Sequence, residues 1–264
     1  MAADAEELRA FALDLADAAD AITLPAFLAG VAASPKPDGT PVTEADTAVE
    51  ALIRTRIGQR YPTHAMLGEE FGEQPGPAGA DGTRWVVDPI DGTVNFARGI
   101  QVWATLIAVE RDGELLASVV AAPALGQRWS AFRGGGATTS RSGVERPIRV
   151  SSVSRLEDAH VVHAGLGAFW DDGRGEGAAA VLRHSARDRG IGDFWGYMLV
   201  AQGSADAMFE LGVKPWDLAA PALVVMEAGG RFTDLDGGEN RTGPSALATN
   251  GALHAELLEA LARS

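Results

Sequence analysis

The chain has 264 residues, 46% of them hydrophobic and 22% charged, so it can bury a sizeable core as one large unit or two packed halves. Its 22 Lys and Arg against 36 Asp and Glu give a formal net charge of -14, which disfavours nucleic-acid binding and requires a local positive charge for any anionic substrate. The chain contains no cysteine, which excludes disulfides and thiolate chemistry, and its histidines lack zinc-site spacing such as HExxH.

The first segment of the chain is acidic and amphipathic. Leu8, Phe11, Leu15 and Ile22 recur at helical spacing, which predicts a long helix over residues 4–33 that packs by one face. The segment has neither the basic start nor the apolar centre of a signal peptide, and no apolar run reaches membrane-spanning length. We therefore expect a cytoplasmic protein without membrane contact.

A proline-rich loop follows and leads into a second helix. Three prolines within residues 34–42 interrupt the helical pattern, and Thr43 has the residue type of an N-cap. Asp46 then falls in the first helical turn, where a negative charge is favourable, so a helix-terminal role alone could explain it. Lys36 lies in the same loop; such a lysine is usually solvated, but it would approach a site if the loop closed.

The stretch WVVDPIDGTVNF, residues 85–96, is the most informative part of the sequence. Its apolar start predicts a buried strand, and Asp88 and Asp91 come at the turn that ends it. Clustered carboxylates are costly unless something positive lies between them, and hard divalent metals take oxygen ligands of this kind. Glu69 and Glu70 precede this strand and, taken alone, would be a solvated surface pair. Together these acidic residues suggest a metal-dependent phosphate site.

The rest of the first half predicts antiparallel strands, and the second half predicts an α/β arrangement. Residues 103–132 alternate in polarity around a turn at Asp112 and Gly113. The glycines at 134–136 lack Walker spacing, so a hairpin is expected there rather than a phosphate loop. From about Ile148, strand-like and helical pieces alternate.

The motif KPWDLAA is the last distinctive feature. Trp216 and Asp217 open an apolar helix that closes at Gly229 and Gly230. On local evidence, Asp217 is simply a carboxylate at a helix N-terminus.

Taken in order, VTEAD, GEE, WVVDPIDGTVNF, KPWDLAA and EAGG resemble the inositol monophosphatase-like family of metal-dependent phosphatases, from Asp46 to Gly230. The resemblance implies the layered αβαβα sugar-phosphatase fold, an α+β / α/β sandwich. It divides the chain into residues 1–147, an α+β half with most metal ligands, and residues 148–264, an α/β half with the specificity residues. Both halves would form one catalytic unit.

The resemblance also implies roles for individual residues. Two or three Mg²⁺ ions per site would be bound by Glu69, Asp88, the Ile90 carbonyl, Asp91 and Asp217. Bound metals can stabilise both the attacking and the leaving oxygen of a phosphate ester.

The water-orienting pair of the family matches Asp46 and Thr93, which we count with Glu69 as catalytic. Backbone N–H groups of Gly92 and Thr93 are expected to hold phosphate oxygens, with Asp91 beside the substrate.

Substrate choice is expected to depend on residues 189–203, RGIGDFWGYMLVAQG. This pattern resembles the histidinol-phosphatase branch of the family, of actinobacterial type. Histidinol phosphate carries an ammonium and an imidazole, which an acid beside an aromatic wall can bind.

Asp193 and Glu210 are therefore candidates for the cationic end, Phe194 or Trp195 for the ring, and Arg189 for a further substrate contact. The alternative for Asp193 is a helix N-cap, for the aromatics ordinary core packing, and for Arg189 a structural or dimer-interface ion pair.

The leading hypothesis is thus a Mg²⁺-dependent phosphomonoesterase that acts on L-histidinol phosphate in histidine biosynthesis. An inositol monophosphatase, or a broader sugar-phosphate or nucleotide 3′-phosphatase, is the alternative within the class. A non-catalytic phosphate-binding regulator is the alternative outside it. The resemblance further implies that the protein is a homodimer and that the molecule it acts on is a small phosphate ester.

Overall fold

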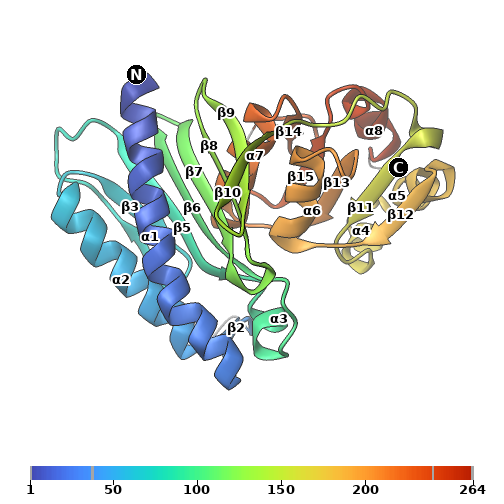
Figure 1. The fold of residues 1–264 in the computed structure, drawn as a ribbon. Helices are drawn as coiled ribbons and strands as arrows, with labels where there is room; N and C mark the ends of the chain where they lie inside the picture. Colours follow the sequence, from blue (N-terminus) through green and yellow to red (C-terminus); the bar gives the residue numbers. More distant parts are fainter. Residues whose placement is uncertain (1, 37–38, 240, 263–264) are drawn as a thin grey trace.

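The structure is a computed structural model that describes residues 2–36, 39–239 and 241–262. Its elements stack in five layers, helix, sheet, helix, sheet, helix (Figure 1). This order confirms the layered αβαβα architecture expected from the sequence. Among the described residues, no helix combines the length and apolar character needed to span a bilayer.

The large sheet has eight strands, and all neighbours are antiparallel except β3 and β5. In spatial order the strands are β10 (Val144–Ile148), β9 (Gly136–Arg141), β8 (Gln127–Phe132), β7 (Glu114–Ala122), β6 (Ala104–Arg111), β5 (Thr83–Asp91), β3 (Ala65–Gly68) and β4 (Gly72–Gln74). The meander from β5 to β10 follows the alternation of apolar residues that predicted antiparallel pairing.

The smaller sheet has five strands and mixed pairing. Its order is β12 (Arg187–Gly190), β11 (His160–His163), β13 (Ala207–Leu211), β15 (Ser245–Thr249) and β14 (Arg231–Thr233). The pairs that involve β11 are parallel and those that involve β15 are antiparallel. Two further short strands, β1 (Ser34–Pro35) and β2 (Pro41–Val42), pair with each other in the loop before α2.

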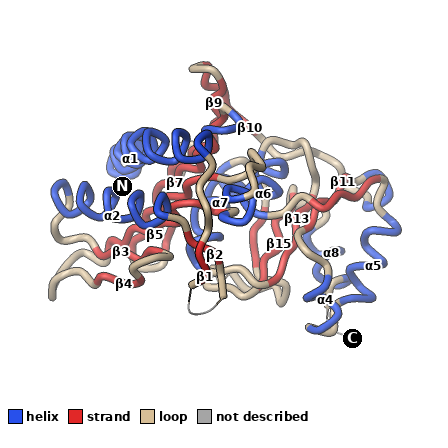
Figure 2. The backbone as a smooth tube through the Cα atoms, turned by 90° about the horizontal axis from the view of Figure 1, so that it is seen from below, coloured by secondary structure: helices blue, strands red, loops and turns tan. Residues whose placement is uncertain are grey.

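Helices α1 (Ala2–Ala29) and α2 (Glu44–Arg60) cover the outer face of the large sheet, and Figure 2 shows them side by side over its strands. Leu8 and Leu15 of α1 pack with Trp85 of β5, because the apolar side chains recur on one helical face. The first helix ends at residue 29, earlier than the predicted residue 33, and Gly30 follows with φ +76°. A glycine in the left-handed region is a common helix stop.

The other helices belong to the central and far layers, apart from α3 (Thr93–Ala97), which follows β5. Helices α6 (Asp193–Ala201) and α7 (Pro215–Glu227) lie between the sheets. The far face of the small sheet is covered by α4 (Gly167–Asp171), α5 (Gly175–His184) and α8 (His254–Ala260). Two 3₁₀ turns span Pro123–Leu125 and Leu156–Asp158.

The two sheets fall in different parts of the chain, on either side of the connection at residues 149–159. They nevertheless share one apolar core, in which Trp129 of the large sheet and Met208 of the small sheet belong to the same cluster as α6 and α7. The boundary at 147/148 remains a prediction.

Candidate active site

Three carboxylates meet where β5 ends. One oxygen from each of Asp88, Asp91 and Asp217 lies within 4.8 Å of the others. Residues three apart in a regular strand face opposite sides of the sheet, but the pairing of β5 with β6 shifts register between Asp88 and Asp91. This irregularity, which contains Pro89, allows both carboxylates to reach the same cleft. The Ile90 N–H donates to Asp88 Oδ1 at 2.9 Å.

Asp217 comes from the start of α7. Lys214 is the N-cap, and its backbone N–H donates to Asp217 Oδ2 at 2.7 Å. The helix-terminal position predicted for Asp217 is therefore correct, and it brings the carboxylate to the two aspartates of β5.

The cluster concentrates negative charge in a buried place. Asp88 and Asp91 are 2% and 8% exposed, and burial together with neighbouring carboxylates raises the pKa of each well above its ordinary value. Burial likewise raises the pKa of Asp217 to about 6. A divalent cation between these oxygens would remove the repulsion, and a donor set made only of oxygen suits Mg²⁺. The residues present therefore fit the metal that the sequence predicts.

Asp46 and Thr93 lie together beside this cluster. The Thr93 hydroxyl is 3.3 Å from Asp46 Oδ1 and 3.0 Å from the Ile90 carbonyl oxygen. Asp46 also belongs to the capping box of α2, because its Oδ2 accepts from the Thr43 N–H at 2.9 Å and from the Thr43 hydroxyl. Burial raises the pKa of Asp46, although the hydrogen bonds from Thr43 oppose this change. The helix-terminal position and the predicted catalytic role thus belong to the same Asp46 carboxylate.

Glu69 lines the same cleft from the turn after β3, but its carboxylate is not one of the three that meet within 4.8 Å. The Lys36 ammonium is 2.7 Å from a carboxylate oxygen of both Glu69 and Glu70. Burial raises the pKa of Glu70 to about 7 despite this hydrogen bond. The lysine of the proline-rich loop therefore reaches the site and provides a positive charge there.

Gly92 joins β5 to α3 at the floor of the cleft and has φ +82°. A Cβ there would lie 3.1 Å from the Val102 carbonyl oxygen and 3.5 Å from Asp193 Oδ2. Both the backbone conformation and the close approach favour glycine.

Asp193 brings the second half of the chain to this cleft. It is the first residue of α6, after the N-cap Gly192, and it has the unusual φ of +54°. Its Oδ2 accepts from the Asn95 amide at 3.1 Å, while the next backbone N–H, that of Phe194, donates to Asp91 Oδ2 at 2.8 Å. Asp193 is therefore not the helix N-cap, and its carboxylate lies over Gly92.

A second cavity of about 510 Å³ adjoins the carboxylate cleft of about 300 Å³, and Asn95, Ala164 and Asp193 line both. Trp195 and His163 are among the other residues that line the larger cavity. A volume of this size is typical of small-molecule sites. Glu210, at 5% exposure, lines the carboxylate cleft from β13, and burial raises its pKa to about 8, with Asp193 and Asp217 adding to the effect.

Two of the predicted substrate residues lie elsewhere. Phe194 is 1% exposed and its ring packs edge-on against Trp129, so it belongs to the core and does not line either cavity. Arg189 is exposed on the edge strand β12 and donates to the Asp188 carbonyl at 2.6 Å. Parallel pairing with β11 places the guanidinium on the sheet edge, so within this chain Arg189 does not join the carboxylates.

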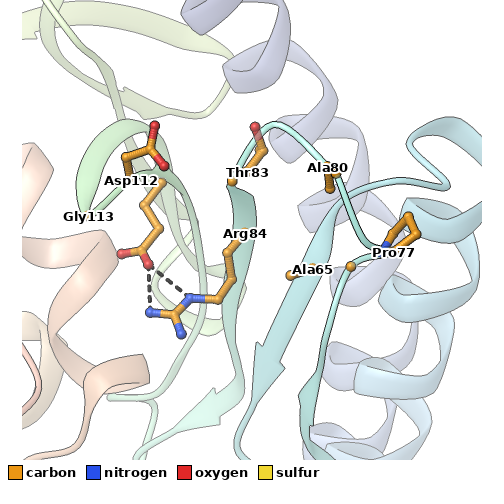
Figure 3. A pocket seen from close by; sticks show the side chains of 11 residues that line it. Ala65, Pro77, Ala80, Thr83, Arg84, Asp112 and Gly113 are labelled. Carbon is orange, nitrogen blue, oxygen red and sulfur yellow. Dashed lines mark hydrogen bonds and ion pairs between the residues drawn. The ribbon is translucent and has the colours of Figure 1, made fainter.

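A further hollow, of about 340 Å³, lies at the opposite end of β5 (Figure 3). Its wall consists mainly of small residues, and Arg84 in this wall forms an ion pair with Glu110 at 2.6 Å. None of the site residues predicted from the sequence lines it.

Sequence reasoning missed three residues that the structure places around the site. Asn95 lies within the 85–96 stretch and holds Asp193, so a polar residue two positions after Thr93 was the available signal. His163 lines the larger cavity, and its Nδ1 is 2.7 Å from the Ala164 carbonyl oxygen. Glu50 lies under the turn that carries Glu69, and nothing in the pattern of α2 distinguishes it from a surface glutamate.

Comparison with known proteins gives consistent relatives. A histidinol-phosphatase of Streptomyces coelicolor is 46% identical over 250 residues, covering 92% of both chains. A histidinol-phosphatase of Mycobacterium tuberculosis is 48% identical over 253 residues, covering 95% of this chain and 96% of the relative. Among solved structures, the extragenic suppressor protein suhB of Bartonella henselae matches with a TM-score of 0.83 at 29% identity, covering 94% and 96% of the two chains.

Fold, site and relatives first define a class: the protein is a phosphatase on a layered α+β fold, with an acidic cluster that could bind metal ions. The sequence profile of the inositol monophosphatase family matches residues 4–264. The chain belongs to the inositol monophosphatase family, and it is similar to the actinobacterial histidinol-phosphatases within it.

Proposed function

We propose that the protein is a Mg²⁺-dependent phosphomonoesterase that hydrolyses L-histidinol phosphate to L-histidinol and phosphate, a step of histidine biosynthesis. The observation that carries this proposal is the Asp193 carboxylate, which lies between the carboxylate cleft and a cavity lined by Trp195. An acid beside an aromatic wall suits a cationic leaving group with a ring. Relatives at 46% and 48% identity that are named histidinol-phosphatases support it.

The metal ligands in this proposal are Glu69, Asp88, the Ile90 carbonyl, Asp91 and Asp217, and together they would hold two or three ions. Bound Mg²⁺ would supply the charge that polarises the phosphate ester and increases the acidity of the attacking water. Until that charge is present, burial and mutual repulsion favour protonated carboxyls at Asp88 and Asp91.

Asp46 and Thr93 would orient the attacking water. A hydroxyl has one proton, so when Thr93 donates it to Asp46 Oδ1, its oxygen is left to accept a hydrogen from water. Thr93 Oγ1 and Asp46 Oδ1 are 3.3 Å apart. As the water oxygen attacks phosphorus, a proton of the water can therefore move to Thr93 Oγ1 while the Thr93 proton moves to Asp46. Asp46 is itself held in place by Thr43.

The remaining groups of the cleft would bind the ester. Backbone N–H groups of Gly92 and Thr93 would donate to phosphate oxygens, and glycine at position 92 leaves room for that approach. Asp193 and Glu210 would pair with the ammonium or the imidazole of the leaving group, and Trp195 would pack on the ring. We extend the proposal to a homodimer, as the family resemblance implies, and to a cytoplasmic location, as the character of the first segment suggests.

Phosphate release from histidinol phosphate tests the proposal. Wild-type protein should release phosphate with Mg²⁺ and stop when the metal is removed by a chelator. Asp91→Asn removes one charge from the cluster and should reduce the rate by at least about 100-fold. A folded wild-type protein that releases phosphate with Mg²⁺ from neither histidinol phosphate nor inositol 1-phosphate would instead support a phosphate-binding regulator.

A further inference from the structure

One glutamate outside the cleft is buried, and both of its carboxylate oxygens accept hydrogen bonds. Glu50 lies in α2 and is 0% exposed. Its Oε2 accepts from the Glu70 N–H at 2.7 Å, and its Oε1 accepts from the Phe71 N–H at 3.1 Å. Arg54, one turn later in the helix, donates to Oε1 through Nε at 2.9 Å. A buried carboxylate is costly, and these charge-assisted contacts offset that cost.

The strand that packs against Glu50 has a glycine where the carboxylate lies. Gly68 is the last residue of β3, and a Cβ at this position would lie 2.1 Å from Glu50 Oε1. A larger residue at 68 would therefore displace the carboxylate. Arg54 also donates to the Gly72 carbonyl of β4 at 2.5 Å, so the pair of side chains contacts both ends of the turn between β3 and β4.

That turn carries Glu69. The Glu69 N–H donates to the Val87 carbonyl at 3.2 Å, which holds the residue against β5, next to Asp88. The following two N–H groups, of Glu70 and Phe71, donate to Glu50. The backbone on both sides of the Glu69 side chain is therefore fixed, on one side by β5 and on the other by α2.

We infer that Glu50 is a positioning residue for the metal site, which holds the turn so that the Glu69 carboxylate faces Asp88 and Asp91. The inference rests on the proposed function, in which Glu69 is a metal ligand. Mutation of a residue that orients a metal ligand typically reduces metal affinity or activity by about 10- to 100-fold. A role limited to fold stability would leave the metal affinity of the folded protein unchanged.

The test measures metal binding directly. Glu50→Gln keeps the shape of the side chain but replaces one acceptor oxygen with an N–H₂ group that faces a backbone donor. We expect its Mg²⁺ dissociation constant, from titration calorimetry, to increase about 10-fold. The Mg²⁺ concentration for half-maximal phosphate release should increase in parallel, while KM for the ester at saturating Mg²⁺ stays within about twofold of wild type.

Two further variants make the test specific. Glu73→Gln is the matched control, because Glu73 lies in β4 beyond the same turn with a side chain that is 62% exposed; its Mg²⁺ affinity should equal that of wild type. Arg54→Ala leaves Glu50 in place but removes its ion-pair partner, so it should weaken Mg²⁺ binding less than Glu50→Gln does. Arg54→Ala decides the question if Glu50→Gln does not fold.

The inference is overturned if the folded Glu50→Gln and Arg54→Ala proteins both bind Mg²⁺ as wild type does, or if Glu73→Gln is equally weakened. A wild-type protein that gives no Mg²⁺ isotherm would overturn the proposed function and this inference with it. Wild-type binding with unchanged variants would overturn the inference alone.

Discussion

At the scale of single residues, Asp193 is the clearest link between backbone geometry and specificity. Its φ of +54° lies in the left-handed region, which Asp and Asn tolerate better than most residues. That conformation lets its side chain reach Asn95 while the next N–H reaches Asp91. The strain is therefore local to a residue that the proposal places at the leaving group.

Asp193→Asn should separate charge from shape, because Asn tolerates the same backbone. Loss of a charge-assisted contact of about 1.5–3 kcal/mol corresponds to an increase in KM for histidinol phosphate of about 10- to 100-fold. KM for a phosphomonoester with an uncharged leaving group should change by less than about threefold. Steady-state kinetics on both substrates measures the difference, and equal effects would indicate that Asp193 is only structural.

Phe194 and Trp195 are neighbours with different surroundings, and they should respond differently to truncation. Phe194→Ala opens a cavity in the core and should reduce the free energy of unfolding by about 3–5 kcal/mol. Trp195→Ala removes a wall of the larger cavity and should increase KM for histidinol phosphate with a smaller loss of stability. Urea denaturation and kinetics on both variants provide the comparison; the reverse pattern would place Phe194 at the substrate.

At the scale of elements, the site depends on how helices and strands begin and end. Asp46 and Asp217 each occupy the third position of a helix and accept a hydrogen bond from the N-cap backbone N–H, and β5 ends at a register shift. Residues that stabilise the ends of these elements are the same residues that form the cleft. For this reason a local interpretation of each aspartate as a helix-terminal charge was correct and incomplete.

Thr43→Ala should therefore affect both stability and catalysis. Removing an N-cap side chain costs about 1 kcal/mol, and Asp46 would also lose a partner that orients it toward Thr93. We expect that loss of stability together with a reduction in kcat of about 10-fold. Thr55→Ala, at an exposed position of the same helix whose hydroxyl donates to Ala51, is the control. A fall in stability without a change in kcat would contradict the orienting role.

The sequence predicted the parts of the site that belong to contiguous motifs. Asp88, Asp91 and Asp217 were expected to converge and do so. The strand end and the helix start could be recognised locally, whereas the position of Asp217 beside the two β5 aspartates was implied only by the family resemblance. The ring contact was assigned to Phe194 or Trp195 without a choice, because helical spacing does not tell which side chain faces the core. Glu50 was not predicted, since a glutamate four residues before an arginine is typical of an exposed helical ion pair.

At the scale of the whole molecule, the buried carboxylates in and beside the cleft make stability depend on pH and metal. Burial raises the pKa of Asp217 to about 6, of Glu70 to about 7 and of Glu210 to about 8. Their ordinary values are 3.8 for Asp and 4.5 for Glu. At pH values between the ordinary and the raised pKa of each group, the folded protein keeps a proton that the unfolded chain has released. The stability of the fold therefore falls as pH rises through this range.

We therefore expect the melting temperature in a chelator to decrease between pH 5 and pH 8, by calorimetry. Mg²⁺ should reverse the decrease, since it binds the ionised carboxylates of the folded state, and its stabilising effect should be larger at pH 8 than at pH 5. A metal-free protein that becomes more stable across this pH range, or one indifferent to Mg²⁺ at pH 8, would contradict this account of the cluster.

The most direct test of the central claim is the ratio of kcat/KM for histidinol phosphate to kcat/KM for inositol 1-phosphate, measured with Mg²⁺ on one preparation of wild-type protein. Inositol offers only hydroxyls to Asp193, whereas histidinol offers a cation. We predict a ratio of at least about 10 in favour of histidinol phosphate. A ratio below one would contradict the proposed substrate and favour an inositol monophosphatase.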